Sequence, residues 1–284
     1  MLMRIVEMTS SAPSVTHVLS GGTSVTAVTS LGDDMFVVRS QCFQEVEVYD
    51  AGTFTLQHRL QVPGLFGGSC GLAACASNKC LYASDSSANL IHRVDLAGSY
   101  AATRWSVGRR PEGLTVSIDK NVLVVIGGKR KLQQFTTHGS RLRTIQLQPD
   151  IQFPSQVIQL TSGQFVISHE GSEHGVCLVD DKGAVVRSYG GARGSDLTKM
   201  NAPVGLAVDK HGNILVADSN NNRLLVLDPT LTSAREMSVS VDGGLEEPYS
   251  LWYDKSRGRL YVSEQDGNRV IVIDHLKDFT ATQV

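Results

Sequence analysis

The chain has 284 residues, of which 41% are hydrophobic and 19% are charged, and it contains 27 glycines. This composition argues against a disordered chain and favours strands and turns over helices. The net charge of −2 excludes a globally basic nucleic-acid binder, although it is compatible with a local basic patch.

The chain consists of six copies of one strand pattern, which begin near residues 24, 69, 111, 154, 203 and 248. Each copy has an apolar first strand, a second strand that ends at a polar turn and a third strand that ends in Asp. A more polar fourth strand follows, for example at 55–62, 141–147 and 184–188. A period of roughly 45 residues with three or four short strands is typical of a β-propeller.

The prolines at 111, 154, 203 and 248 begin first strands, where a missing N–H costs least. The last copy has only residues 276–284 for a fourth strand, whereas the segment 14–19 has strand character. We therefore expect the N-terminal part, residues 1–23, to supply a strand that closes the last blade. The prediction is a single all-β domain over 1–284, a six-bladed propeller with four-stranded antiparallel blades.

The copies that begin at 203 and 248 carry the clearest motif. The first contains Gly-Leu-Ala-Val-Asp from Gly205, then Gly-Asn-Ile-Leu-Val-Ala-Asp from Gly212, and then Asn222-Arg223. This pattern resembles the NHL repeat, and the chain is similar to the NHL region of tripartite-motif (RING-NHL) proteins. The WD dipeptide of WD40 repeats is absent, and the glycine pairs are too irregular for kelch repeats.

Acidic and basic residues flank one turn in these two copies. Asp218 ends a second strand and Arg223 opens the third, and Glu264 and Arg269 repeat the arrangement. Charge-assisted hydrogen bonds across a short turn would fix the hairpin, so we interpret both pairs as structural.

Cysteine and histidine spacing predicts no metal site and no catalytic site. Cys70, Cys75 and Cys80 lack the spacing of zinc ligands, and we interpret the cysteines as reduced, buried thiols. His169 and His174, with neighbouring glutamates, form the most metal-like cluster, which we interpret as a solvated loop. Glu112 is the only acidic residue expected at the central channel. We therefore expect no enzyme, no cofactor and no metal.

One face of the propeller is expected to bind a partner. We name it the top face: it carries the turns between second and third strands and the loops that lead into first strands. One blade places basic residues there, and a neighbouring loop adds an apolar tip. The predicted partner-binding residues are Arg109, Arg110, Lys129, Arg130, Lys131, Leu65 and Phe66. Opposite them, the last two copies place acidic residues, namely Asp218, Asp242, Glu246, Glu247, Glu264 and Asp266.

The resemblance implies two functions for such a face, since some tripartite-motif propellers bind RNA and others recruit substrates for ubiquitin transfer. We expect a protein-interaction scaffold, with a role in substrate recognition by a ubiquitin-ligase pathway suggested by the family. RNA binding through the basic patch is the alternative, although acidic loops would repel phosphates. A lactonase-like or lyase-like enzyme is a weaker third possibility. The thiols predict a cytoplasmic protein, and the lack of long apolar runs predicts that it does not enter membranes. We expect the propeller to be monomeric.

Overall fold

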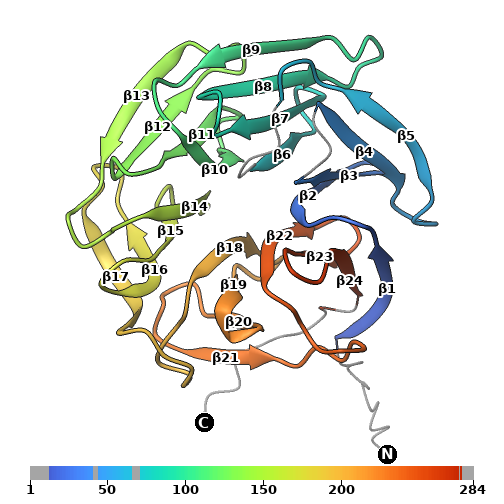
Figure 1. The fold of residues 1–284 in the computed structure, drawn as a ribbon. Coiled ribbons are helices and arrows are strands. Elements are labelled where there is room, and N and C mark those ends of the chain that lie inside the picture. Colours follow the sequence, from blue (N-terminus) through green and yellow to red (C-terminus); the bar gives the residue numbers. More distant parts are fainter. Residues whose placement is uncertain (1–12, 41–43, 66–70, 275, 277–284) are drawn as a thin grey trace, which may run out of the picture.

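The computed structural model describes residues 13–40, 44–65, 71–274 and 276, which form a six-bladed β-propeller (Figure 1). Six four-stranded antiparallel sheets surround a central axis, and each sheet is one blade. The predicted fold class is therefore confirmed. Within the described ranges the only helix is the short 3-10 turn η1 (Ser219–Asn221), and no helix is long and apolar enough to cross a membrane.

The blades follow one another along the chain, and each runs from the central axis outwards. Blades 1 to 3 contain β2 (Val25–Leu31), β3 (Asp34–Arg39), β4 (Glu45–Asp50) and β5 (Leu56–Gln61); β6 (Leu72–Cys75), β7 (Cys80–Asp85), β8 (Leu90–Asp95) and β9 (Ala102–Ser106); and β10 (Pro111–Val116), β11 (Val122–Ile126), β12 (Lys131–Phe135) and β13 (Arg141–Gln146).

Blades 4 to 6 repeat this order. They contain β14 (Pro154–Gln159), β15 (Phe165–His169), β16 (His174–Val179) and β17 (Val185–Gly191); β18 (Pro203–Val208), β19 (Ile214–Asp218), β20 (Arg223–Leu227) and β21 (Ala234–Met237); and β22 (Pro248–Asp254), β23 (Arg259–Glu264), β24 (Arg269–Asp274) and β1 (Ser14–Ser20).

The N-terminal strand closes the ring, as predicted. β1 pairs antiparallel with β24, from Ser14 opposite Asp274 to Ser20 opposite Arg269. The two strands lie side by side although they come from opposite ends of the chain (Figure 1). Leu19 is buried in a cluster that joins blade 6 to blade 1. This pairing removes the exposed edge that β24 would otherwise present.

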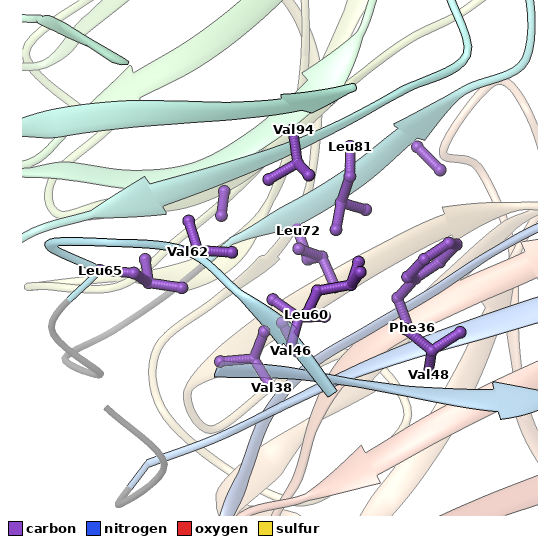
Figure 2. Close-up of a cluster of buried hydrophobic side chains, with 13 residues drawn as sticks. Phe36, Val38, Val46, Val48, Leu60, Val62, Leu65, Leu72, Leu81 and Val94 are labelled. Atoms are coloured by element: carbon purple, nitrogen blue, oxygen red, sulfur yellow. The ribbon is translucent and has the colours of Figure 1, made fainter. Parts of the chain in front are cut away.

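The core lies between the blades. The strands β7, β11, β15 and β19 are buried along their whole length, because a neighbouring blade covers each face. The outer strands β5 and β13 each bury one residue. Each interface between blades has its own apolar cluster. Figure 2 shows the one between blades 1 and 2, where Leu60 of β5 packs near Leu72 of β6.

The inner strands approach one another closely where the repeated glycine occurs. A Cβ added to Gly113 would lie 2.5 Å from the carbonyl oxygen of Ser155 in the next blade, and one added to Gly205 would lie 2.3 Å from that of Tyr249. No side chain fits in these gaps. The glycine in the first strand of the repeat therefore sets the narrow packing around the axis.

Closure by β1 should contribute strongly to stability. Deleting residues 1–20 removes β1 and exposes both β24 and the cluster around Leu19. Because burying one large apolar side chain contributes about 1.5–3 kcal/mol, we expect the free energy of unfolding to fall by about 3 kcal/mol or more, with increased aggregation. Thermal and urea denaturation measure the effect. Deleting only residues 1–12 keeps β1 and serves as the control, and equal stability of the two truncations would contradict closure.

Candidate functional site

A cluster of basic side chains lies on the top face of blade 3. Arg109 and Arg110 precede β10, and Lys129, Arg130 and Lys131 lie at the turn between β11 and β12; we call these five residues the basic cluster. The two segments are side by side, since the backbone N–H of Gly127 donates to the carbonyl oxygen of Arg110 at 2.9 Å. The side chain of Lys131 is half-buried, and the other four residues are exposed.

Most of this charge is not neutralised. Across the described residues, the one ion pair of the basic cluster joins Arg110 Nε to Glu112 Oε1 at 2.7 Å. The register explains the surplus: Lys131 lies opposite Ile126, whereas Arg223 lies opposite Asp218 at the same place in blade 5. Blade 3 therefore has no acidic residue opposite the cation that begins its third strand.

The prediction that Leu65 is an exposed partner-binding residue beside the basic cluster was wrong. This residue is only 1% exposed and belongs to the cluster between blades 1 and 2 (Figure 2). The chain turns at Gly64, whose φ of +82° favours glycine, and it directs the Leu65 side chain into the interface. Leu65 is therefore a core residue and cannot anchor a partner. Phe66 lies outside the described residues.

An exposed aromatic residue is present elsewhere on the same face. Phe153, 60% exposed, ends the loop that starts at Leu147, whose N–H donates to the Arg130 carbonyl oxygen at 2.9 Å. Phe153 has a φ of +41°, and Ala202 and Glu247 adopt the same left-handed backbone before the prolines of blades 5 and 6. The repeated turn explains the positive φ of Phe153, but it does not explain why a phenyl ring is exposed at this position. Comparing the residue before each proline would have revealed it.

The two predicted hairpin pairs also stabilise the loops that lead into their blades. Arg223 Nε donates to Asp218 at 2.7 Å, and the same guanidinium donates to the carbonyl oxygens of Ser195, Asp196 and Lys199 at 2.6, 3.1 and 3.0 Å. Arg269 likewise pairs with Glu264 and donates to two carbonyl oxygens of the preceding loop. Each arginine therefore fastens the top-face loop that leads into its blade.

These pairs also correct the predicted charge of the top face. Asp218 and Glu264 are fully buried, so they add nothing to its acidic side. Of the other acidic residues predicted on this side, Asp242, Glu246 and Asp266 are exposed and Glu247 is half-buried.

Blade 1 contains an inverted pair that sequence comparison missed. Here the cation is on the second strand and the acid on the third: Arg39 Nε donates to Glu47 at 2.9 Å, and both side chains are buried. Burial alone would raise the pKa of Glu47, but hydrogen bonds from Arg39 and Tyr49 outweigh it and hold the pKa below its usual range. Arg39 also donates to the Thr23 carbonyl oxygen, so it fastens a loop as Arg223 does.

Blade 4 replaces the pair by a buried neutral contact. His169 Nε2 lies 3.2 Å from Cys177 Sγ. Burial is the main cause that lowers the pKa of His169 to about 4 and raises that of Cys177 to about 11. Imidazole and thiol are thus both neutral near pH 7, which does not suit a thiolate nucleophile. Our interpretation of His169 as part of a solvated loop was wrong, because it ends the buried strand β15.

A cavity of about 230 Å³ runs along the central axis. Residues at the starts of the inner strands line it, including the predicted Glu112 as well as Thr26, Gln156, Gly205 and Tyr249. Burial raises the pKa of the Glu112 carboxyl more than the neighbouring Arg110 lowers it. Within the part of the chain that the structure describes, no three His, Cys, Asp or Glu residues are grouped to hold a metal ion.

Comparison with known proteins supports the propeller assignment. The NHL repeat family model matches residues 200–227, which span β18, β19 and β20. The chain is thus a six-bladed β-propeller that contains an NHL repeat. No curated protein sequence matches it significantly.

Several solved structures share the fold at low sequence identity. A streptogramin B lyase is 11% identical with a TM-score of 0.67, and the match covers 91% of this chain and 96% of that one. The hydrazine synthase of Kuenenia stuttgartiensis is 15% identical with a TM-score of 0.66, covering 94% and 99%. An inactive virginiamycin B lyase from Staphylococcus aureus with quinupristin is 12% identical with a TM-score of 0.65, covering 94% and 86%. At these identities the likeness shows the fold alone.

The buried pair of blade 5 should show strong energetic coupling. Replacing Asp218 by Asn or Arg223 by Met leaves one buried partner unpaired, which typically costs about 3–5 kcal/mol. The double variant should lose less free energy of unfolding than the two single variants lose together. Urea denaturation of the wild type, both single variants and the double variant measures this coupling. A cycle on the exposed pair Lys199–Asp196 is the control, and should give at most about 1 kcal/mol. Equal coupling in both cycles would contradict the structural role.

The lowered pKa of Glu47 predicts a pH dependence. Its contribution to stability is complete above the unfolded-state pKa of about 4.3 and is lost as the pH falls through the lower folded-state pKa. The variant Glu47→Gln should therefore lose less stability than the wild type between pH 5 and acid. Glu45→Gln, on the same strand but in a more exposed pair with Arg59, is the control and should keep the wild-type profile.

Proposed function

We propose that this propeller is a non-catalytic scaffold whose top face binds an acidic segment of a protein partner. One observation carries the proposal: the surplus charge of the basic cluster lies next to the loop that presents Phe153. A carboxylate-bearing segment would neutralise Arg109, Lys129 and Arg130, and an apolar residue of the same segment would cover the phenyl ring.

The rest of the top face supports an oriented partner. Asp242, Glu246 and Asp266 are exposed in the loops of blades 5 and 6, across the ring from blade 3. A partner with one acidic and one basic region would therefore fit in a single orientation. Such complementarity contributes mainly to specificity and association rate.

The mixed charge of the top face favours protein over RNA. Aromatic residues next to Arg are frequent anchors of protein interfaces. RNA binding is the alternative, since a base can stack on a phenyl ring and phosphates can bind to the basic cluster. The exposed carboxylates on the same face would weaken phosphate binding, so RNA is an outcome of the test and not the proposal.

The proposal includes the absence of an enzymatic role and a cytoplasmic location. The buried contact between His169 and Cys177 supports a structural role for these residues, and the free, buried thiols of Cys75, Cys80 and Cys177 fit a reducing compartment. Incubation with quinupristin tests the lyase alternative, and its cleavage would contradict the proposal. Nothing in the described part of the chain points to a ubiquitin-ligase pathway, so the proposal ends at partner binding.

The triple variant Lys129→Gln, Arg130→Gln, Phe153→Ala tests the surface. Proteins captured by the wild type should be lost by this variant, because it removes the surplus charge and the apolar contact. A matched control is Lys182→Gln with Lys210→Gln, two exposed lysines in turns on the opposite face, and it should retain the same partners.

RNA crosslinking of the same three proteins separates the alternatives. We expect no crosslinks above background for the wild type. Capture unchanged in the triple variant would contradict the proposed surface. RNA crosslinks that disappear in the triple variant, with steep salt dependence, would replace the protein partner by RNA.

A further inference from the structure

The central cavity has a wall of mixed apolar and polar residues with few charged groups. Its partly exposed apolar lining residues include Val116, Ile158, Val204, Val208 and Trp252, contributed by four different inner strands. Its volume of about 230 Å³ is far above the roughly 10–15 Å³ that one water requires. Ligand sites in proteins are typically concave and mainly apolar with a few placed polar groups.

Two ionisable side chains lie at opposite ends of this cavity. Glu112 is the second residue of β10, at the top face, and Lys255 follows the end of β22, at the other face. Along the described lining, these are the only Asp, Glu, Lys, Arg or His residues. A charged ligand entering from the top therefore meets a single carboxylate.

The carboxylate of Glu112 is held in place. The Ser84 hydroxyl donates to the Glu112 carbonyl oxygen at 2.6 Å, which fixes the backbone. The side chain lies over Gly127, where an added Cβ would approach Oε1 to 2.6 Å, so a larger residue there would displace it. Oε1 accepts from Arg110, whereas Oε2 has no hydrogen-bond partner among the described residues.

We propose that the central cavity binds a small organic cation with an apolar body. Its ammonium group pairs with Glu112 at the top of the cavity, and its apolar part lies against the walls formed by the inner strands. This site is distinct from the surface proposed for the protein partner, although Arg110 of the basic cluster pairs with Glu112.

Arg110 competes with such a ligand for Glu112. The Arg110 side chain is 65% exposed, whereas that of Glu112 is 18% exposed. An exposed cation loses little by returning to water, because surface ion pairs contribute at most about 1 kcal/mol. An ammonium with an apolar body gains the burial of that body as well. The ligand therefore displaces Arg110 from Glu112.

Three matched six-carbon probes test the site: hexylammonium, 1-hexanol and hexanoate. Binding is measured by saturation-transfer NMR on the probes and by the fluorescence of Trp252, which lines the cavity. We expect hexylammonium to bind about tenfold more tightly than hexanol, since a hydrogen bond to a charged group contributes about 1.5–3 kcal/mol. Hexanoate should bind more weakly still.

Two variants give opposite predictions. Glu112→Gln should weaken hexylammonium binding on the order of tenfold and leave hexanol unchanged, because it removes only the charge. Arg110→Gln should strengthen hexylammonium binding, because it removes the competitor. Glu246→Gln, an exposed glutamate on the same face but outside the cavity lining, is the control and should bind as the wild type does. Melting temperatures within about 2 °C of wild type show that a variant is folded.

Several results would overturn the cation site. These are no binding of hexylammonium to the wild type, equal affinity for hexylammonium and hexanol, or unchanged affinity in folded Glu112→Gln. Tighter binding of hexanoate would assign the cavity to an anion, at Lys255. None of these results affects the capture experiment on Lys129, Arg130 and Phe153, so the two proposals fail separately.

Discussion

The packing of one blade on the next is the constraint on which the whole structure depends. A single four-stranded sheet cannot bury both of its faces, and here the neighbouring blades do so, with one apolar cluster at each interface. The last interface exists only if the ring closes, which β1 achieves by pairing with β24. The top-face loops also contribute to these interfaces, since Leu65 and Ile151 are buried in the clusters of blades 1 and 2 and of blades 3 and 4.

The buried position at the top of the second strand differs between blades and divides the top face into two parts. In blades 5, 6 and 1, an arginine pairs with a buried acid and fastens a loop, as Arg223 does with Asp218. In blade 3 the acid is replaced by Ile126, and Lys131 joins a surplus of positive charge. Without a buried acidic partner, the strand-three cation of blade 3 therefore contributes to a charged surface and does not hold a loop.

The repeat allowed the sequence to predict the architecture, because hydrophobic periodicity and the position of Pro and Gly report local backbone geometry. It also placed the basic cluster on one face. The prediction from the repeat was wrong for Leu65, since a single turn at Gly64 decides whether the next side chain faces solvent or the interface between blades. It missed the pair of Arg39 and Glu47 because the same ionic contact can form with the two charges exchanged, which a motif search does not detect.

The pair of Arg110 and Glu112 joins the surface to the channel. Arg110 is one of the exposed cations of the basic cluster, while Glu112 is the acid at the top of the cavity, and they share one ion pair. A cation on Glu112 would release Arg110 and increase the free positive charge of the surface. An acidic segment bound to Arg110 would in turn free Glu112 for the cation. Because coupling free energies are reciprocal, each event would favour the other by the same factor.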